Sequence, residues 1–360
     1  MLMPLEWLVV LFGGLALALY TALNLPFPDL YSALNLPLPH LSGAVSANAD
    51  SAAVAAAGGP VVRYLLPFLL LFTLSIENYA FILLVFMAVT SLGIVYAKVF
   101  KAEAVSWSRF GASVLERVSL SNILQDFRFL SAMVLMLAEF AVLKNLIPRV
   151  NSSSWDSLLE GSDRLICGGR MCSELLLGWF GVETLDAITD HYLFFFRYLS
   201  LVATFFVVAV PRRFTQQFLC AVMAAYLLGI LWVYAMPSTG PVFVRGELYG
   251  FLGDGRIAQL QRGLTATQAD AYLISGLPSL HVAVVMIGSL FLWRVSRLFG
   301  LASWLFLFLT INSTIYLGWH YVLDDVAAVV LGLAVVWLSG RCSWVWTGCP
   351  EKGLFLKLRG

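Results

Sequence analysis

Long apolar stretches separated by short polar segments dominate this 360-residue chain. Many of them run for about 20 residues, the length that an α-helix needs to cross the hydrocarbon core of a bilayer. The pattern predicts spans at 5–23, 78–99, 129–147, 191–210, 215–236, 279–297, 301–319 and 322–340. The sequence therefore predicts an all-α polytopic membrane protein with about eight spans.

The chain divides into three parts. Residues 1–128 form an N-terminal accessory membrane region of one to three helices, with a flexible loop rich in Pro, Ala, Ser and Gly at 24–60 and an amphipathic surface helix at 100–128. Residues 61–77 are apolar and fit an interfacial helix, an extension of the next span or a separate crossing. A six-helix core follows at 129–340, and 341–360 is a cytoplasmic tail.

Composition supports a membrane protein. Hydrophobic residues make up 60% of the chain and charged residues only 12%, against about 25% charged in soluble domains. The net charge of +1, without a clustered Lys/Arg stripe, gives no reason to expect a nucleic-acid partner. Cys167 and Cys172 flank a short loop, and both a disulfide and two free thiols are compatible with the sequence.

The Lys and Arg residues predict the orientation of the spans. Cytoplasmic loops carry an excess of these residues, and by alternation one side receives Lys98, Lys101, Arg109, Arg117, Arg128, Arg212, Arg213, Arg294, Arg297 and the basic tail. The opposite side receives three long loops, 24–63, 148–190 and 237–278. We expect the basic side to be cytoplasmic and the long loops to be non-cytoplasmic.

Three ionisable residues meet at the predicted non-cytoplasmic face. His281 opens the span 279–297, His320 follows the span 301–319, and Asp324 opens the next one. Asp324 comes four residues after His320, so on a continuous helix the two side chains share one side, while Asp325 points about 100° away. A carboxylate there fixes the imidazole tautomer and makes the other ring nitrogen a better nucleophile, and a second histidine supplies a general acid.

Two motifs carry a family resemblance. "GLPSLHVA" at 276–283 and "STIYLGWHYVLD" at 313–324 resemble the phosphatidic acid phosphatase type 2 (PAP2) superfamily, most closely its inositol phosphorylceramide synthase branch. "SWDSLLEGSDRLICGG" at 154–169 and "YAMPSTGPVF" at 234–243 are also similar to that branch. The resemblance covers 129–340.

The resemblance implies a phosphohistidine mechanism without metal or cofactor. His320 would attack phosphorus, Asp324 would orient it, and His281 would protonate the leaving oxygen. Ser279 and backbone N–H groups at its helix start would hold phosphate oxygens. The phosphatase branch has cations where this chain has Thr314 and "PSTGPVFVR", so Arg245 would replace part of the missing charge.

These features favour an integral membrane phosphotransferase acting on lipid substrates. It would move an inositol-phosphate-like head group from a lipid phosphodiester donor to a hydroxyl acceptor. The alternatives are a lipid phosphate or pyrophosphate phosphatase with the same site, and a non-enzymatic transporter or scaffold. The His320–Asp324 pair alone would also fit a structural contact between helices, and with His281 a zinc site. Trp319 and Tyr321, beside the histidine, fit an interfacial aromatic belt.

Overall fold

The computed structural model describes residues 119–189, 195–249 and 276–341. Every regular element in these ranges is a helix, as the sequence predicts. The predicted spans 5–23 and 78–99, the segment 61–77, the loop 24–60 and the tail beyond Arg341 lie outside the described residues. The total of eight spans therefore stays a prediction.

In the part of the chain that the structure describes, six long helices form the bundle, in the predicted order. They are α7 (Leu120–Val150), α11 (Phe195–Ala209), α12 (Arg212–Ala235), α15 (Leu280–Val295), α16 (Arg297–Tyr316) and α17 (Val322–Arg341). Helix α7 begins nine residues before the predicted span at 129, so 120–128 continue a long helix instead of forming part of a separate surface helix. Within the described residues, four segments are long and apolar enough to cross a membrane: Leu120–Leu137, Arg212–Ala235, Arg297–Tyr316 and Val322–Arg341. The chain is an integral membrane protein.

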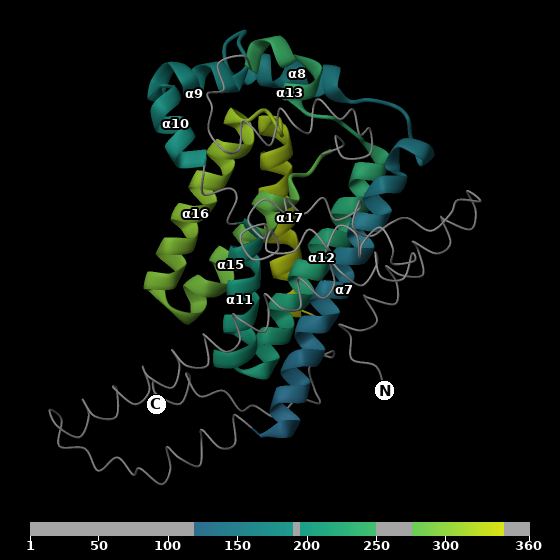
Figure 1. Cartoon of the computed structure of the whole chain (residues 1–360), viewed down its shortest axis with the longest axis vertical. Coiled ribbons are helices and arrows are strands. Elements are labelled where there is room, and N and C mark those ends of the chain that lie inside the picture. Colours follow the sequence, from purple (N-terminus) through teal and green to yellow (C-terminus); the bar gives the residue numbers. More distant parts are fainter. Residues whose placement is uncertain (1–118, 190–194, 250–275, 342–360) are drawn as a thin grey trace, which may run out of the picture.

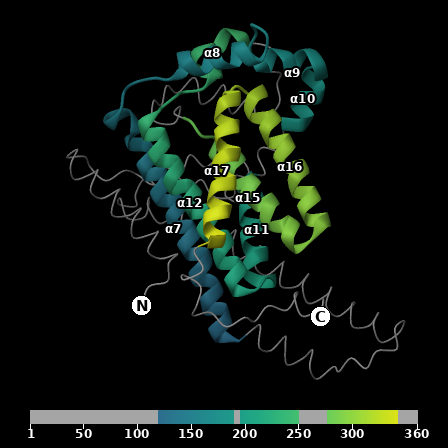
Figure 2. The ribbon, with the colours of Figure 1, turned by 180° about the vertical axis from the view of Figure 1, so that it is seen from behind.

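Helix α15 lies inside the bundle and contacts α11, α12, α16 and α17, while α12 also contacts α7 (Figures 1 and 2). Nearly every α15 side chain from Val282 to Leu292 is buried. Aromatic rings fill the space between helices, and the centroids of Phe206 and Phe218 are 4.3 Å apart. The outer surfaces of α16 and α17 instead expose apolar side chains such as Leu301 and Val330. Exposed apolar surface on long helices is expected where lipid is the solvent.

Three short helices cover one end of the bundle, and we call them the cap (Figure 1). They are α8 (Asp156–Ile166), α9 (Cys172–Phe180) and α10 (Val182–Thr189), within the segment 148–190 that the sequence analysis treats as a long loop. Two short elements lie beside the cap, α13 (Pro241–Val244) and the 3₁₀ helix η3 (Gly246–Tyr249).

Apolar contacts attach the cap to the helix ends below it. One buried cluster joins Leu159 and Met171 of the cap region to Leu277 and Tyr321. A second cluster joins cap leucines to the end of α16 and to η3, through Leu176, Leu185, Val242, Tyr249, Tyr316 and Leu317. The cap is therefore packed against the residues that connect α16 to α17.

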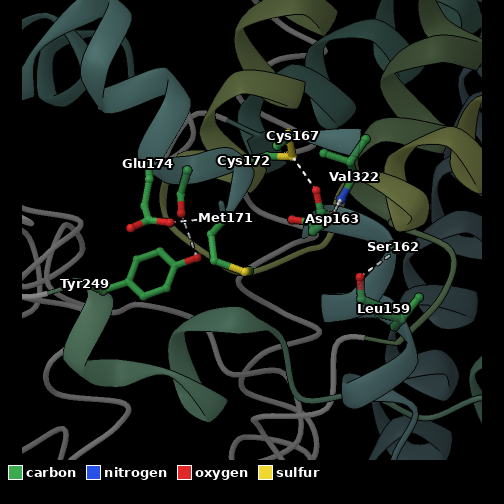
Figure 3. The surroundings of a disulfide bond; sticks show 10 residues. Leu159, Ser162, Asp163, Cys167, Met171, Cys172, Glu174, Tyr249 and Val322 are labelled. Atoms are coloured by element: carbon green, nitrogen blue, oxygen red, sulfur yellow. Dashed lines mark hydrogen bonds between the residues drawn. A yellow bond between two sulfur atoms is a disulfide. The ribbon is translucent and has the colours of Figure 1, made fainter. Parts of the chain in front are cut away.

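A disulfide links the end of α8 to the start of α9 (Figure 3). Cys167 and Cys172 have Cα atoms 5.4 Å apart. The carboxylate of Glu174 accepts the N–H of Met171 at 2.8 Å, which fixes the first turn of α9. Of the two possibilities that the sequence leaves open, the structure has the bonded pair.

Candidate active site

His320 lies in the short connection between α16 and α17, directly beneath the cap. Gly318 has φ +67°, which turns the chain after α16, and the backbone N–H groups of Trp319 and His320 donate to the carbonyl of Thr314 at 3.0 and 3.3 Å. Helix α17 begins at Val322, so His320 precedes it. The expected continuous helical turn through 320–324 is therefore wrong, because a glycine turn separates the two helices. The pairing itself is present, with His320 Nδ1 3.3 Å from Asp324 Oδ2.

The carboxylate of Asp324 fixes the histidine in one orientation. Its Oδ2 also accepts the N–H of Tyr321 at 3.0 Å, and the side chain is fully buried. When Asp324 is ionised it can only accept, and Nδ1 of His320 is then the nitrogen that donates. Burial, followed by the positive charge of Lys144, lowers the pKa of His320 to about 3. The ring is then neutral, and Nε2 keeps the lone pair that a nucleophile needs.

His281, in the first turn of α15, faces the ring of His320. Its ring centroid is 6.2 Å from that of His320, and 4.5 Å from Phe195 in an edge-to-face contact. The backbone N–H of Ser279 donates to the carbonyl of Asp324 at 3.1 Å, which joins the start of α15 to the start of α17. The structure thus brings together the three residues predicted to be catalytic.

Thr314 and Asp325 join α16 to α17. The Thr314 hydroxyl lies 2.9 Å from Asp325 Oδ2, and both side chains are buried. The Ser279 side chain lies against Asp325, although outside the geometry of a direct hydrogen bond. Asp325, which the helical spacing places away from the site, is instead part of its support, because the turn at Gly318 brings α16 against the start of α17.

Arg245, predicted to contact substrate, lies against the cap. Its Nε donates to both oxygens of Glu160 at 3.2 Å, and Arg164 donates to the same carboxylate at 2.9 and 3.0 Å. Burial acts to raise the pKa of Glu160, but hydrogen bonds and charges from Arg245 and Arg164 outweigh it, so that pKa is below its usual value. Arg245 is thus engaged by α8.

The buried face of α8 carries three acidic residues that were not predicted to belong to the site. Asp156, Glu160 and Asp163 recur every three or four residues and are all buried. Asp163 accepts the N–H of Val322, at the start of α17, at 2.9 Å (Figure 3). Burial raises the pKa of Asp163 to about 6. The signal was present in the sequence as a helical spacing of acids, within a segment interpreted as loop.

The prediction that Tyr321 belongs to an interfacial aromatic belt is also wrong. Its side chain is fully buried and its hydroxyl donates to Asp156 at 3.1 Å, so it is not a residue of the interfacial belt. Burial, with the nearby Asp156, raises its pKa far above the usual value. Tyr321 connects the residue next to His320 with the cap.

Lys144 is a second residue that the sequence analysis missed. It lies on α7, and its charge acts on both His281 and His320. The neighbouring carbonyl of Leu143 accepts the hydroxyl of Tyr234 at 2.6 Å, and Asn151 donates to the Tyr234 carbonyl at 2.9 Å, so this end of α7 is attached to α12. A lysine inside the predicted span 129–147 is the signal that points to it.

Comparison with known families agrees with this geometry. Residues 177–338 match the family model of the PAP2 superfamily, a range that includes His281, His320 and Asp324. No curated protein and no solved structure matches the chain. The match indicates a membrane enzyme of the phosphatase or phosphotransferase type, without distinguishing the inositol phosphorylceramide synthase branch. Within the described residues, no group of three or more His, Cys, Asp or Glu side chains could hold a metal ion.

Proposed function

We propose that the protein transfers a phosphate-bearing head group from a lipid phosphodiester donor to a hydroxyl acceptor, through a phosphohistidine at His320. The observation that carries the proposal is the pairing of His320 Nδ1 with Asp324 at 3.3 Å, together with a second imidazole, that of His281, whose ring centroid lies 6.2 Å from that of His320. A nucleophile held by a carboxylate with a separate acid beside it is the arrangement that covalent catalysis requires.

In the first step, Nε2 of His320 attacks phosphorus and a P–N bond forms. The bond from phosphorus to the donor's lipid oxygen breaks, and His281, which takes up a proton when the phosphodiester anion binds beside it, gives that proton to the oxygen. In the second step, His281 takes the proton of the acceptor hydroxyl, whose oxygen attacks phosphorus. The P–N bond breaks, and both histidines return to their starting states.

Lys144 is the proposed anchor for the phosphate charge. Arg245 and Thr314, both predicted to contact substrate, are paired with Glu160 and Asp325 in the structure. Lys144 instead acts on both histidines. One lysine complements a phosphodiester, which carries one negative charge, better than a terminal phosphate, which carries two. Ser279 adds a buried hydroxyl oxygen without a hydrogen-bond partner among the described residues.

We further propose that the site faces the non-cytoplasmic side. The disulfide between Cys167 and Cys172 lies in the cap that covers the site. Disulfides persist in oxidising compartments and are rare in the cytosol. The predicted excess of Lys and Arg at the opposite ends of the spans supports the same orientation.

The test supplies phospholipids labelled in the head-group phosphate to purified protein in mixed micelles, with and without alcohols such as inositol or a ceramide-like lipid. Acceptor-dependent formation of a labelled product, lost in His320→Ala, is the expected result. Lys144→Met should raise KM for the donor about tenfold, and Lys144→Arg should keep most of the affinity. Fast release of free phosphate from a monoester or pyrophosphate, insensitive to every acceptor, would establish a phosphatase instead. Retention of activity after prolonged EDTA treatment is expected, and loss that zinc restores would contradict the metal-free mechanism.

A further inference from the structure

One buried carboxylate of the cap binds two separate loops of the site. Asp156, 4% exposed, accepts the N–H groups of Thr239 and Gly240 at 3.0 and 3.1 Å, and also the hydroxyl of Thr239 at 3.1 Å. From the other side it accepts the hydroxyl of Tyr321 at 3.1 Å. Ser154, within its own segment, donates at 2.5 Å. The backbone N–H of Trp155 adds a contact to Pro237 at 2.9 Å.

Both loops contact or contain residues that lie one or two positions from His320 in the sequence. Tyr321 follows His320 directly, and its N–H donates to the Asp324 oxygen that pairs with the imidazole. The loop of Gly240 lies against the same connection, since the N–H of Val242 donates to the carbonyl of Gly318 at 2.9 Å. A Cβ at Gly240 would come within 2.6 Å of the carbonyl oxygen of Trp319. The two backbones are therefore in close contact beside His320.

We propose that Asp156 is a positioning residue, which sets the orientation of the His320 ring by holding Tyr321 and the 237–240 loop in one arrangement. It acts through those residues and touches neither histidine. The expected effect of Asp156 on catalytic activity rests on the function proposed above. The cap is then part of the catalytic machinery as well as a cover.

The partners of Asp156 favour a carboxylate at this position because all of them donate hydrogen bonds. Asp156 receives only donors: two backbone N–H groups and three hydroxyls, of Thr239, Tyr321 and Ser154. An ionised carboxylate has about four acceptor sites and no hydrogen to present, whereas an amide directs two N–H groups outward. Asp156→Asn keeps the shape but turns a donor against at least one of these partners, which costs a buried hydrogen bond.

The experiment compares Asp156→Asn, Tyr321→Phe and the double variant in the full-length protein. The matched control is Glu174→Gln, which alters another cap carboxylate that accepts a backbone N–H but contacts the start of α9 instead of the site loops. The first readout is kcat and KM for the labelled donor. The second needs no substrate: the rate at which diethyl pyrocarbonate acylates His320, followed by mass spectrometry of its peptide. Thermal unfolding in micelles gives the folded fraction.

We expect Asp156→Asn to lower kcat by at least about tenfold with KM changed less than about threefold, and Tyr321→Phe to have a smaller effect. The double variant should be no worse than Asp156→Asn, because both changes break the same contact. Acylation of His320, 3% exposed in the intact protein, should be several-fold faster in both single variants and unchanged in Glu174→Gln.

Two results would overturn the proposal: unchanged His320 acylation in both single variants, or losses of kcat that match the loss of folded protein. If Asp156→Asn does not fold, Tyr321→Phe gives the same decision with the same readouts. If the unaltered protein transfers no head group from any donor, the proposed function fails. The acylation rates still decide whether Asp156 positions His320.

Discussion

The two ends of the helical bundle hold buried carboxylates in different ways. At the start of α7 and α12, Asp126 is fully buried and forms an ion pair with Arg212, which also donates to the carbonyl of Asn122 at 3.3 Å. At the capped end, Glu160 is likewise paired with arginines, Arg164 and Arg245, but four further carboxylates are buried there: Asp156, Asp163, Asp324 and Asp325. Their contacts come from neutral partners: backbone N–H groups, hydroxyls and the ring of His320.

This difference indicates that the two kinds of carboxylate have different roles, one in stability and one in the reaction. A carboxylate paired with a guanidinium is neutralised, and its contribution is to hold two helices together. Carboxylates held by neutral donors keep their geometry without being bound to a fixed cation. They can orient an imidazole and stabilise the positive charge that it gains during the reaction. The comparison predicts that changes at the two ends will affect different measurements.

The largest effect is expected at the capped end. His320→Ala should reduce activity by more than about a thousandfold, because the nucleophile is lost, and Asp324→Asn by about a hundredfold or more, because the tautomer is wrong. Acid-labile label on the protein, measured after a single turnover, should vanish in His320→Ala. The melting temperature should stay close to that of the unaltered protein. Substantial activity in His320→Ala would contradict the mechanism.

A large effect of another kind is expected at the opposite end. Arg212→Met should destabilise the protein by about 3–5 kcal/mol, because Asp126 is left buried without its partner, while activity per folded molecule is unchanged. Denaturation in micelles, together with activity normalised to folded protein, measures both quantities. The control is Arg213→Met, which removes the same charge from an exposed position next to it. Recovery of stability in the double variant Asp126→Leu, Arg212→Met would confirm the cause; lower specific activity in Arg212→Met would break the comparison.

The smallest effect concerns the pH dependence of stability. Asp163 has a pKa of about 6 in the folded protein, above its unfolded value of 3.8, because burial disfavours its charge. The folded state therefore binds the proton more tightly, and the free energy of unfolding falls as pH rises from about 4 to about 6. Asp163→Asn should flatten this slope and add about 1–3 kcal/mol at neutral pH, provided that the amide oxygen still accepts the N–H of Val322. Melting temperatures from pH 4 to pH 8 test it. Identical pH profiles would contradict the assignment.

The bundle was largely predictable because its helices are long and apolar. The spans 215–236 and 322–340 agree with α12 and α17 to within a few residues. The convergence of His281, His320 and Asp324 was predictable too, since ionisable side chains at the ends of apolar helices are rare and costly. Two motifs with a recognisable order then indicated their roles.

The cap was not predictable in the same way. Helix α8 is short and carries Asp156, Glu160 and Asp163 on its buried face, opposite to the usual rule that a helix buries its apolar side. Its contacts reach residues far along the chain, such as Tyr321 and Val322. The spacing of His320 and Asp324 was also misleading, because it suggested one helix where Gly318 makes a turn. Long-range pairing of polar groups decided the first point, and a local pattern does not encode it. The backbone turn at Gly318 decided the second.

The disulfide of the cap has a practical consequence for handling the protein. Cys167 and Cys172 are five residues apart, so the bond closes a small ring. Chain-entropy arithmetic gives about 2 kcal/mol for a ring of this size. The disulfide therefore stabilises the end of α8, the helix that carries Asp156 and Asp163. Protein produced in a reducing cytosol, or purified with dithiothreitol, would lack it. Preparations for functional assays should therefore come from a secretory or periplasmic route and be kept free of thiol reductants.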